Sequence, residues 1–354
     1  MNIIQSEEFL HLNPLVSVVI PSYNRAETLS GAIDSILKQA CNFDFELVIG
    51  DDCSSDSSRN ILLQYQQKYP RSIKLLFHEN NIGLGSNWAI CVQQCKGKYV
   101  TNCDNDDYWH NVHKLQIQVD YMECHLNCGL LHTDYDELDI VSHSIVRSYR
   151  TKSKEQILQG HRQQEIFNGE LKIVSPTVCF RKELFDKYIP VDKYIELNFP
   201  IEDWPTWLIL SKYSEIDYLP ISTATYRVGH ESLSNLDSYN KVLSKFTKEK
   251  VMYKFLCDMF PDDLEFVEKD YNKHVDRVLF NIAFKKTDFK ITKKYGQKLK
   301  KQGEMNLKIA STSNVLMFYV FSLLRKIKIK WSSLFLGVYV LLFNCLGIVS
   351  GIDL

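Results

Sequence analysis

The sequence lacks an excess of charge of either sign. Its 354 residues contain 42 Lys and Arg against 43 Asp and Glu, for a formal net charge of -1. This balance argues against a nucleic-acid binder that works through a domain-wide basic surface. With 14 Gly and 9 Pro, the chain also lacks collagen-like or low-complexity character. Because 45% of the residues are hydrophobic and 24% are charged, the composition indicates a globular chain and excludes an acidic, disordered one.

A secretory signal and a disulfide framework are missing as well. Residues 1–14 carry two glutamates and no apolar core segment, so we expect a short N-terminal leader and no signal peptide. The ten cysteines are expected to be reduced and mostly buried in a cytosolic protein. A zinc site at Cys91, Cys95, Cys124 and Cys128 is the less favoured alternative, because structural zinc sites usually contain tighter C-x2-C pairs.

The C-terminal part has a different composition. Two apolar runs, 315–324 and 334–349, flank the basic segment RKIKIK. The second run has 16 residues, fewer than the ~20 that cross a bilayer core. Because the adjacent cations suit an anionic cytoplasmic leaflet, we expect residues 313–354 to form an apolar, membrane-associated tail, either peripheral or tail-anchored. A buried pair of helices is the alternative.

Residues 240–312 show helical apolar spacing with many lysines, which predicts a helical extension. A solvated helix face is the ordinary interpretation of such a lysine cluster. Beside an apolar tail, we favour contact with anionic lipid head groups or with a lipid-diphosphate acceptor. The clustered residues are Lys285, Lys286, Lys290, Lys293, Lys294, Lys298, Lys300 and Lys301.

Short apolar runs alternate with helical patterns in the first third of the chain. The predicted strands are 16–20, 47–50, 73–77 and 98–103, and the predicted helices are 27–38, 60–68, 86–94 and 109–122. This alternation predicts right-handed βαβ units in an α/β fold, with a mostly parallel central sheet and flanking helices. Ligands of such sheets bind beyond the carboxyl ends of the strands.

The loops at these strand ends carry polar residues instead of glycines. The segment PSYNR after the first strand contains neither G-x-G-x-x-G nor G-x-x-x-x-G-K-[ST], which argues against an ordinary dinucleotide or P-loop site. Tyr23 and Arg25 offer a ring that can stack on a base and a guanidinium that can meet a phosphate. Asp51 and Asp52 can accept hydrogen bonds from a base or a ribose, whereas Asp56 is better interpreted as a helix cap.

Three carboxylates, Asp104, Asp106 and Asp107, follow the fourth predicted strand. Carboxylates that repel one another are unfavourable unless a cation lies between them. Mg²⁺ and Mn²⁺ prefer oxygen ligands and often share their coordination shell with a diphosphate. Taken alone, the motif fits a metal site and a solvated acidic turn equally well.

Taken together, these segments resemble the large family 2 of inverting glycosyltransferases, which have the GT-A fold. The resemblance extends over about residues 15–235, so we expect a GT-A catalytic domain at 15–239, after the leader. A strand-terminal D-x-D-D followed by E-D-W is much more specific than either motif alone. The matching segments are VSVVIPSYNRAETLSGAIDSILKQ, ELVIGDDCSSD, HENNIGLGSNWAI, GKYVTNCDNDDYW, SPTVCFRKELF, IEDWPTWLIL and YRVGHESLS.

The resemblance implies roles for individual residues. It implies nucleotide binding by Pro21, Tyr23, Arg25, Asp51, Asp52 and Asp104; a metal site of Asp104, Asp106 and His230; a general base at Asp203; and acceptor contacts by Trp109, Glu202 and Trp204. Core packing is an equal alternative for each tryptophan. The sequence departs from the family pattern where many relatives have a histidine, because Gly229 stands there and His230 follows. Arg227 is a second candidate for the diphosphate.

The expected reaction is metal-assisted transfer of a sugar from a nucleotide-diphosphate sugar, through a single displacement with inversion. The expected enzyme is a hexosyl- or N-acetylhexosaminyl-transferase. UDP is the favoured nucleotide, Mn²⁺ or Mg²⁺ the expected metal, and a saccharide or lipid-linked saccharide the expected acceptor. The expected role is in bacterial surface-polysaccharide synthesis, at the cytoplasmic face of the cell membrane. No nucleic-acid partner is expected. The alternatives are a non-catalytic sugar-nucleotide-binding scaffold and a sugar nucleotidyltransferase.

Overall fold

The computed structural model describes residues 1–153, 158–229, 239–304 and 306–313, together with residues 315, 318, 319 and 322. The chain divides into two compact units. The first contains Met1–Asn235 and Lys248–Glu265, and the second contains Leu236–Thr247 and Phe266–Leu354. The helix α11 (Tyr239–Met259) contributes residues to both units.

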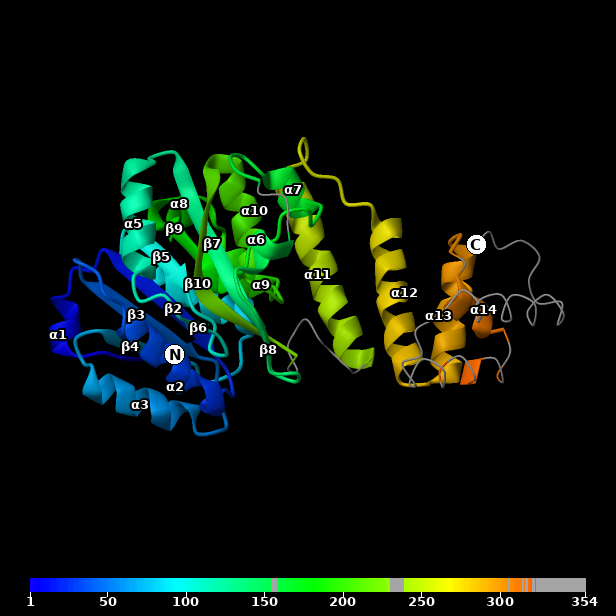
Figure 1. Ribbon diagram of the computed structural model, residues 1–354, viewed down its shortest axis with the longest axis horizontal. Coiled ribbons are helices and arrows are strands. Elements are labelled where there is room, and N and C mark those ends of the chain that lie inside the picture. Colours follow the sequence, from blue (N-terminus) through cyan, green and yellow to red (C-terminus); the bar gives the residue numbers. More distant parts are fainter. Residues whose placement is uncertain are drawn as a thin grey trace. The chain divides into compact units, whose positions relative to one another are not determined.

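The first unit is built on one large sheet (Figure 1). Among the described residues its strands follow the order β1-β4-β3-β2-β5-β9-β7-β10-β6, and β8 pairs with β7. The strands are β1 (Asn2–Ile4), β2 (Val16–Ser22), β3 (Phe45–Asp51), β4 (Ile73–Phe77), β5 (Tyr99–Asn102), β6 (Tyr108–Trp109), β7 (Cys128–Asp139), β8 (Ser144–Val146), β9 (Val178–Arg181) and β10 (Glu215–Val228).

The sheet is mixed, so the predicted α/β class is confirmed while the prediction of a mostly parallel sheet is wrong. β2 pairs in parallel with β3 and β5, β3 with β4, and β7 with β10. β9 lies antiparallel between β5 and β7, and β1, β6 and β8 also pair antiparallel. Among these antiparallel pairs, β7 and β8 are consecutive in the chain and are joined without a crossover helix.

The helices of the first unit cover both faces of this sheet (Figure 1). They are α1 (Glu7–Leu10), α2 (Ala26–Leu37), α3 (Ser58–Lys68), α4 (Leu84–Gln93), α5 (Lys114–Cys124), α6 (Tyr149–Ser153), α7 (Gln163–Phe167), the 3-10 turn η1 (Ser175–Thr177), α8 (Lys182–Tyr188), α9 (Val191–Glu196) and α10 (Asp203–Tyr213). The first three predicted helices match α2, α3 and α4 within two residues. The fourth begins only at Lys114, because Tyr108–Trp109 forms β6 and pairs with β10.

Alternating side chains of the central strands divide the interior into two cores. In β2, Val18 and Ile20 face one core, whereas Val19 faces the other. The first core includes residues of α2, α3 and α5, and the second includes Trp88 of α4 and Trp207 of α10. Both tryptophans are fully buried, with ring centroids 6.3 Å apart. The sheet is therefore covered by helices on both sides, and open ligand sites are confined to its edges.

The second unit is helical. It contains the start of α11 with α12 (Glu268–Lys285), α13 (Phe289–Lys301) and α14 (Leu307–Ser311). Leu279 and Phe284 of α12 pack with Leu299 of α13 in a separate apolar core. The helix α13 begins after Asp288, whose carboxylate accepts a hydrogen bond from the Ile291 N–H at 3.0 Å. Such a cap satisfies one of the free N–H groups of the first turn.

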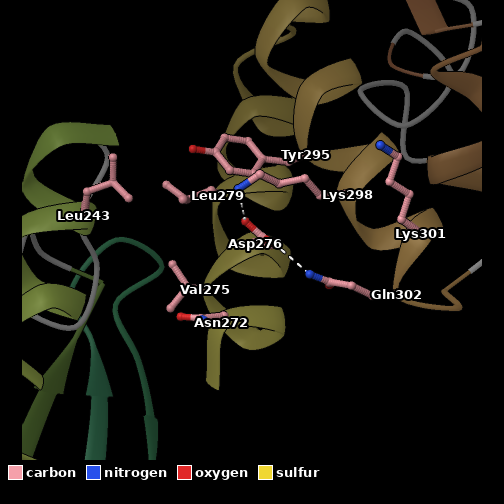
Figure 2. A pocket seen from close by; sticks show the side chains of 9 residues that line it. All are labelled: Leu243, Asn272, Val275, Asp276, Leu279, Tyr295, Lys298, Lys301 and Gln302. Carbon is pink, nitrogen blue, oxygen red and sulfur yellow. Dashed lines mark hydrogen bonds and ion pairs between the residues drawn. The ribbon is translucent and has the colours of Figure 1, made fainter. Parts of the chain in front are cut away.

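A pocket of about 500 Å³ opens beside these helices (Figure 2). Asp276 lies in it and accepts hydrogen bonds from Lys298 Nζ at 3.0 Å and from Gln302 Nε2 at 3.1 Å. The lining residues are Leu243, Asn272, Val275, Asp276, Leu279, Tyr295, Lys298, Lys301 and Gln302. Apolar side chains thus form much of the wall, and lysines lie at one side.

The tail predicted at 313–354 lies almost entirely outside the described residues. Within the part of the chain that is described, no helix has the length and apolar character needed to span a bilayer. The nine cysteines described there are free thiols, and no cluster of three or more potential metal ligands exists among the described residues. The zinc alternative therefore has no support in this part of the chain.

His132 of β7 predicts a pH dependence of stability. The side chain is 1% exposed, and neither ring nitrogen has a hydrogen-bond partner among the described residues. Burial, with a smaller contribution from the charge of Arg150, lowers the pKa of His132 well below its usual value. The unfolded chain therefore binds a proton below pH ~6.5 that the folded chain does not bind. Stability should fall by up to about 1.4 kcal/mol for each pH unit below that value.

We expect His132→Phe to reduce this loss between pH 7.5 and 5, as measured by urea unfolding at several pH values. His11→Phe, at an exposed position, is the control and should leave the pH dependence unchanged. An equal loss of stability on acidification in wild type and His132→Phe would contradict the assignment.

Candidate active site

The parallel strands bring several polar segments to one edge of the sheet. β2, β3 and β5 end at Ser22, Asp51 and Asn102, and their parallel pairing places these ends together. The antiparallel strand β9 connects β5 to β7, so β7 and its parallel partner β10 run in the same direction as β2. The end of β10, which contains Tyr226, therefore lies at the same edge.

Tyr226 marks a group of carboxylates at this edge. Its pKa is raised by burial and by the charges of Asp107, Asp104, Asp106 and Asp203. Burial and the charges of Asp106 and Asp203 raise the pKa of Asp104 to about 8. The structure thus brings together the D-x-D-D segment and the E-D-W segment, which lie almost 100 residues apart in the sequence.

Two buried carboxylates of this group each have an oxygen without a hydrogen-bond partner among the described residues. These oxygens are Asp107 Oδ2 and Glu202 Oε2. Burial, reinforced by neighbouring carboxylates, raises the pKa of both residues well above the usual range. Because an unpaired buried charge is unfavourable, both side chains are expected to bind a proton when the edge holds no cation.

Two arginines supply positive charge beside the carboxylates. Arg25 Nε lies 3.6 Å from Asp106 Oδ2. Arg227 donates from Nη1 to the Asp106 carbonyl at 2.9 Å, and its guanidinium lies 5.1 Å from the centre of the Tyr108 ring. The backbone N–H of Arg227 donates to Asp107 Oδ1 at 2.8 Å. Asp107 therefore positions the end of β10, and with it Arg227.

The donor set at this edge fits a hard divalent cation that shares its coordination with a phosphorylated ligand. Asp104 and Asp106 offer carboxylate oxygens, and burial, with the neighbouring charges of Asp106 and Asp203, raises the pKa of Asp104. Mg²⁺ is commonly held by one or two carboxylates together with substrate phosphates. A complete protein cage is not found among the described residues, and the predicted third ligand, His230, lies outside them.

The loop after β2 is held in place by the loop after β3. Asn24 adopts a left-handed backbone conformation with φ of 50°, and its Oδ1 accepts a hydrogen bond from the Ser55 N–H at 2.8 Å. Asp56 Oδ1 accepts a hydrogen bond from the N–H of Ser58, the first residue of α3, at 3.0 Å, so Asp56 acts as the predicted helix cap. Its Oδ2 also accepts one from the N–H of Ala26, the first residue of α2, at 3.1 Å. Tyr23 remains 47% exposed. The Pro21 carbonyl accepts a hydrogen bond from Asn105 Nδ2 at 2.9 Å.

The adjacent aspartates Asp51 and Asp52 differ in their surroundings. Asp51 Oδ1 accepts hydrogen bonds from Arg59 Nε and from the Ser54 N–H, while its Oδ2 is buried without a partner among the described residues. Asp52 accepts hydrogen bonds from the backbone N–H groups of Ile82 and Gly83 at 2.7 and 2.9 Å. Asp51 therefore has an oxygen left for a ligand, whereas the Asp52 carboxylate holds the loop before α4.

The three predicted acceptor contacts have different environments. Trp109 is 3% exposed and donates from Nε1 to the Pro176 carbonyl at 3.1 Å, so its ring packs in the core and cannot present a face to a sugar. Glu202 is 4% exposed. Trp204 is half-buried, donates to the Ile166 carbonyl at 2.9 Å and packs against Tyr253. The core-packing alternative thus describes Trp109, and we leave it out of the proposed acceptor site.

Sequence reasoning assigned no individual role to three residues of this edge. Asp107 carried a signal as the last residue of D-x-D-D, and Tyr226 carried a weaker one as the neighbour of Arg227. Arg59, on α3, carried none, because an arginine in the first turn of a helix normally faces solvent. Its Nη2 also donates to the His78 carbonyl, so it connects β3 to the residue after β4.

Arg59 is expected to stabilise the fold by pairing with the buried Asp51. Arg59→Met would leave the Asp51 carboxylate, which is fully buried, with only one N–H donor. Removing one partner of a buried ion pair is strongly destabilising, and because Arg59 is one-third exposed we expect a loss of about 2–4 kcal/mol in the free energy of unfolding.

Urea unfolding measures this loss, and Arg71→Met is the matched control. Arg71 pairs with Asp44 on the surface, where both side chains are more than half exposed, so its loss should be below about 1 kcal/mol. Equal effects of the two substitutions would contradict a special role for Arg59.

The candidate site lies at the carboxyl ends of the strands of an α/β sheet. It combines two arginines with a group of oxygen acceptors, and this combination suits an anionic ligand rich in hydroxyl groups. Residues 17–189 match the family model described as Glycosyl transferase family 2. Over this segment, which is just under half of its 354 residues, the chain is similar to glycosyltransferase family 2.

Several relatives with printed names are similar to the chain. It is 27% identical over 258 residues to the UDP-Glc:alpha-D-GlcNAc-diphosphoundecaprenol beta-1,3-glucosyltransferase WfgD of Escherichia coli, covering 71% of this chain and 88% of WfgD. It is 35% identical over 122 residues to the putative teichuronic acid biosynthesis glycosyltransferase TuaG of Bacillus subtilis, covering 34% of this chain and 47% of TuaG.

An uncharacterized protein of Mycobacterium tuberculosis is 34% identical over 110 residues, covering 31% of this chain and 32% of that protein. The chain thus spans from about a third to about half of the length of the first curated relatives that it matches.

Solved structures give a more distant similarity. S. aureus TarS 1-349 in complex with UDP-GlcNAc has a TM-score of 0.48 and 18% identity, covering 87% of this chain and 88% of that chain. The mannosyltransferase PcManGT from Pyrobaculum calidifontis has a TM-score of 0.49 and 13% identity, covering 72% and 67% of the two chains. At TM-scores below 0.5, these similarities decide neither the fold nor the substrate.

Proposed function

We propose that this protein is an inverting glycosyltransferase that moves a sugar from a nucleotide-diphosphate sugar to a hydroxyl of a saccharide or lipid-linked saccharide in surface-polysaccharide synthesis. The observation that carries the proposal is the gathering of Asp104, Asp106 and Asp203 at the strand edge. The match of residues 17–189 to the family model supports it, and the name of WfgD, which contains UDP-Glc and diphosphoundecaprenol, favours a UDP-sugar and a lipid-linked acceptor.

The donor site would use the loops after β2 and β3. Tyr23 is exposed enough to stack on a base, and Asp51 Oδ2 is a buried acceptor without a partner among the described residues, suited to a base N–H. Arg25 and Arg227 would meet the diphosphate, since guanidinium groups bind phosphate oxygens through paired hydrogen bonds. Pro21 would shape the same loop. Asp52, predicted to face the same nucleotide, would hold the loop before α4 through the N–H groups of Ile82 and Gly83.

Asp104 and Asp106 would hold Mn²⁺ or Mg²⁺ together with the diphosphate. When bound, such an ion neutralises the charge that develops on the leaving diphosphate. Asp106 is the better candidate for the direct ligand, and Asp104 for the ribose or the metal. Arg25, close to Asp106, would be released from that carboxylate to contact a phosphate as the ligands bind.

Asp203 would act as the general base on the acceptor hydroxyl. It is the first residue of α10, and its Oδ1 accepts a hydrogen bond from the Trp204 N–H at 2.6 Å, which fixes the carboxylate. Burial, opposed by that N–H, raises the pKa of Asp203. A higher proton affinity makes the carboxylate a better base near neutral pH. Trp204 and Glu202 would border the acceptor.

A product assay tests the proposed reaction. The full-length protein is incubated with UDP-glucose, UDP-GlcNAc or GDP-mannose, Mn²⁺ and a polyprenyl-diphosphate-linked saccharide. Acceptor-dependent release of the free nucleoside diphosphate supports transfer. Release of pyrophosphate from a nucleoside triphosphate and a sugar phosphate would indicate a nucleotidyltransferase instead, and nucleotide binding without turnover on any acceptor would indicate a scaffold.

A lipid-linked acceptor would place the protein at the cytoplasmic face of the cell membrane, where the apolar sequence of residues 313–354 could contribute to attachment. Fractionation of cells that produce the full chain, with and without these residues, tests this part of the proposal. Equal membrane fractions for both forms would exclude a role of the tail in attachment.

A further inference from the structure

The second unit carries a concentration of positive charge that the proposed reaction does not use. Residues 285–301 contain eight lysines and one acidic residue, Asp288. All eight lysines are exposed. The Asp288 carboxylate caps α13, and Lys298 is the one lysine of the eight that forms an ion pair within the described residues. The positive charge is therefore largely uncompensated by neighbouring side chains.

Six of these lysines lie on one side of α13. This lysine face consists of Lys290, Lys293, Lys294, Lys298, Lys300 and Lys301. At 100° per residue they occupy an arc of about 160°. The opposite side packs into the core of the second unit through the buried residues Thr292, Tyr295, Gly296 and Leu299. The helix is thus amphipathic, with its apolar side already satisfied and its cationic side directed to solvent.

Helix stability does not explain the lysine face. Lysines in the last turn, such as Lys300 and Lys301, interact favourably with the helix dipole. Lys290 lies in the first turn, where a cation interacts unfavourably with the helix dipole. Lys293 and Lys294 follow it at i+3 and i+4, so the three like charges repel one another. A chain whose overall net charge is -1 therefore concentrates cations on one helix at some expense in stability.

The neighbouring pocket is a weaker candidate for a binding site. Its single carboxylate, Asp276, is already paired with Lys298 and Gln302 (Figure 2). Its remaining polar groups show no arrangement that selects a particular ligand. The charge of the exposed lysines, by contrast, selects an extended anionic surface.

We propose that the lysine face of α13, extended by Lys285 and Lys286 at the end of α12, binds the surface of a membrane rich in anionic phospholipids. Basic residues near such a surface are attracted by its negative potential, whereas a neutral bilayer offers no such attraction. Two apolar runs, 315–324 and 334–349, follow α13 in the sequence, and their composition is consistent with membrane contact by the C-terminal part of the chain. The inference deepens the proposed function, on which it rests for the lipid-linked acceptor.

Vesicle sedimentation with the full-length protein tests the lysine face. Vesicles of phosphatidylcholine alone are compared with vesicles that contain phosphatidylglycerol, at 50 and 500 mM salt. We expect binding to the anionic vesicles at low salt and much weaker binding to neutral vesicles or at high salt, where charges are screened. Each lysine contributes about fivefold to partitioning, so changing Lys290, Lys293, Lys294 and Lys301 together to Gln should reduce it by about 600-fold.

A second four-lysine variant is the control. Lys38, Lys68, Lys172 and Lys187 are exposed on the first unit, and their change to Gln alters the net charge by the same amount. This variant should bind anionic vesicles as the wild type does. Gln and Lys have similar helix propensities, so both variants should keep the wild-type circular dichroism spectrum.

Equal binding of the lysine-face variant and the wild type would overturn the inference and point to the C-terminal sequence. Binding to neutral vesicles as strong as to anionic ones, or no binding to either, would also overturn it. UDP binding is measured on the same samples. If the lysine-face variant loses vesicle binding but still binds UDP, the loss is due to the lysine face alone. If the wild type binds vesicles but no nucleotide, the proposed transferase is refuted, while the proposed membrane-binding surface is retained.

Discussion

Replacing Asp203 with Asn is expected to lower turnover by about 10²–10⁴, the usual contribution of a positioned general base. The amide keeps the size of the side chain, and its oxygen can still accept the hydrogen bond from the Trp204 N–H. It cannot take a proton from an acceptor hydroxyl. Because Asp203 is assigned to the acceptor side, the affinity for UDP should stay within about threefold of the wild type. The rate of acceptor-dependent UDP release and calorimetric titration with UDP measure the two quantities.

Asp262→Asn is the control for this variant, since Asp262 is exposed and lies in the same unit. It should leave turnover unchanged. A turnover of Asp203→Asn within about threefold of the wild type would show that another group accepts the proton. A parallel loss of UDP affinity would assign Asp203 to the donor site instead.

Replacing Asp106 with Ala is expected to weaken UDP binding in the presence of Mn²⁺ by tenfold or more, which corresponds to at least about 1.4 kcal/mol. The carboxylate is a proposed ligand of the cation that the diphosphate shares, and it also lies beside Arg25. Wild-type binding should fall to a similar extent when EDTA removes the metal, and EDTA should have little further effect on the variant. Titrations with UDP, GDP and dTDP, each with Mn²⁺ or Mg²⁺, measure these affinities and identify the nucleotide.

Asp262→Ala is the matched control and should bind like the wild type. Metal-dependent binding that survives in Asp106→Ala would remove this residue from the metal site. If the folded wild type bound none of the three nucleotides, the donor site as drawn would be wrong, and a scaffold role would become the better hypothesis.

The first half of the fold could be predicted from the sequence because its strands are apolar runs between clear helical patterns. The later strands could not. In β7, His132, Thr133 and Asp134 are all buried, so the strand shows neither an apolar run nor simple alternation. The direction of β9 depends on which neighbours it finds in the sheet, and nothing in its own four residues specifies it. The error of a mostly parallel sheet has this origin.

For the site, the sequence identified the residue types and the structure added their surroundings. The strand-end carboxylates Asp104 and Asp106 were expected together with Asp203, and they lie at one edge. Trp109 was assigned to a helix and weighed as an acceptor contact, yet it pairs in a strand and packs in the core. Its burial depends on the strand β10, more than 100 residues away, and so could not be deduced from local sequence.

The hydrogen bonds between the loops after β2 and β3 have a kinetic consequence. Asn24 and Asp56 hold the two loops in one arrangement before any ligand arrives. A preorganised loop loses little conformational entropy on binding, so the association rate need not include a slow ordering step. Differences in affinity between donor nucleotides should then reside in how long each remains bound, and residence time becomes the quantity by which this enzyme would choose its donor.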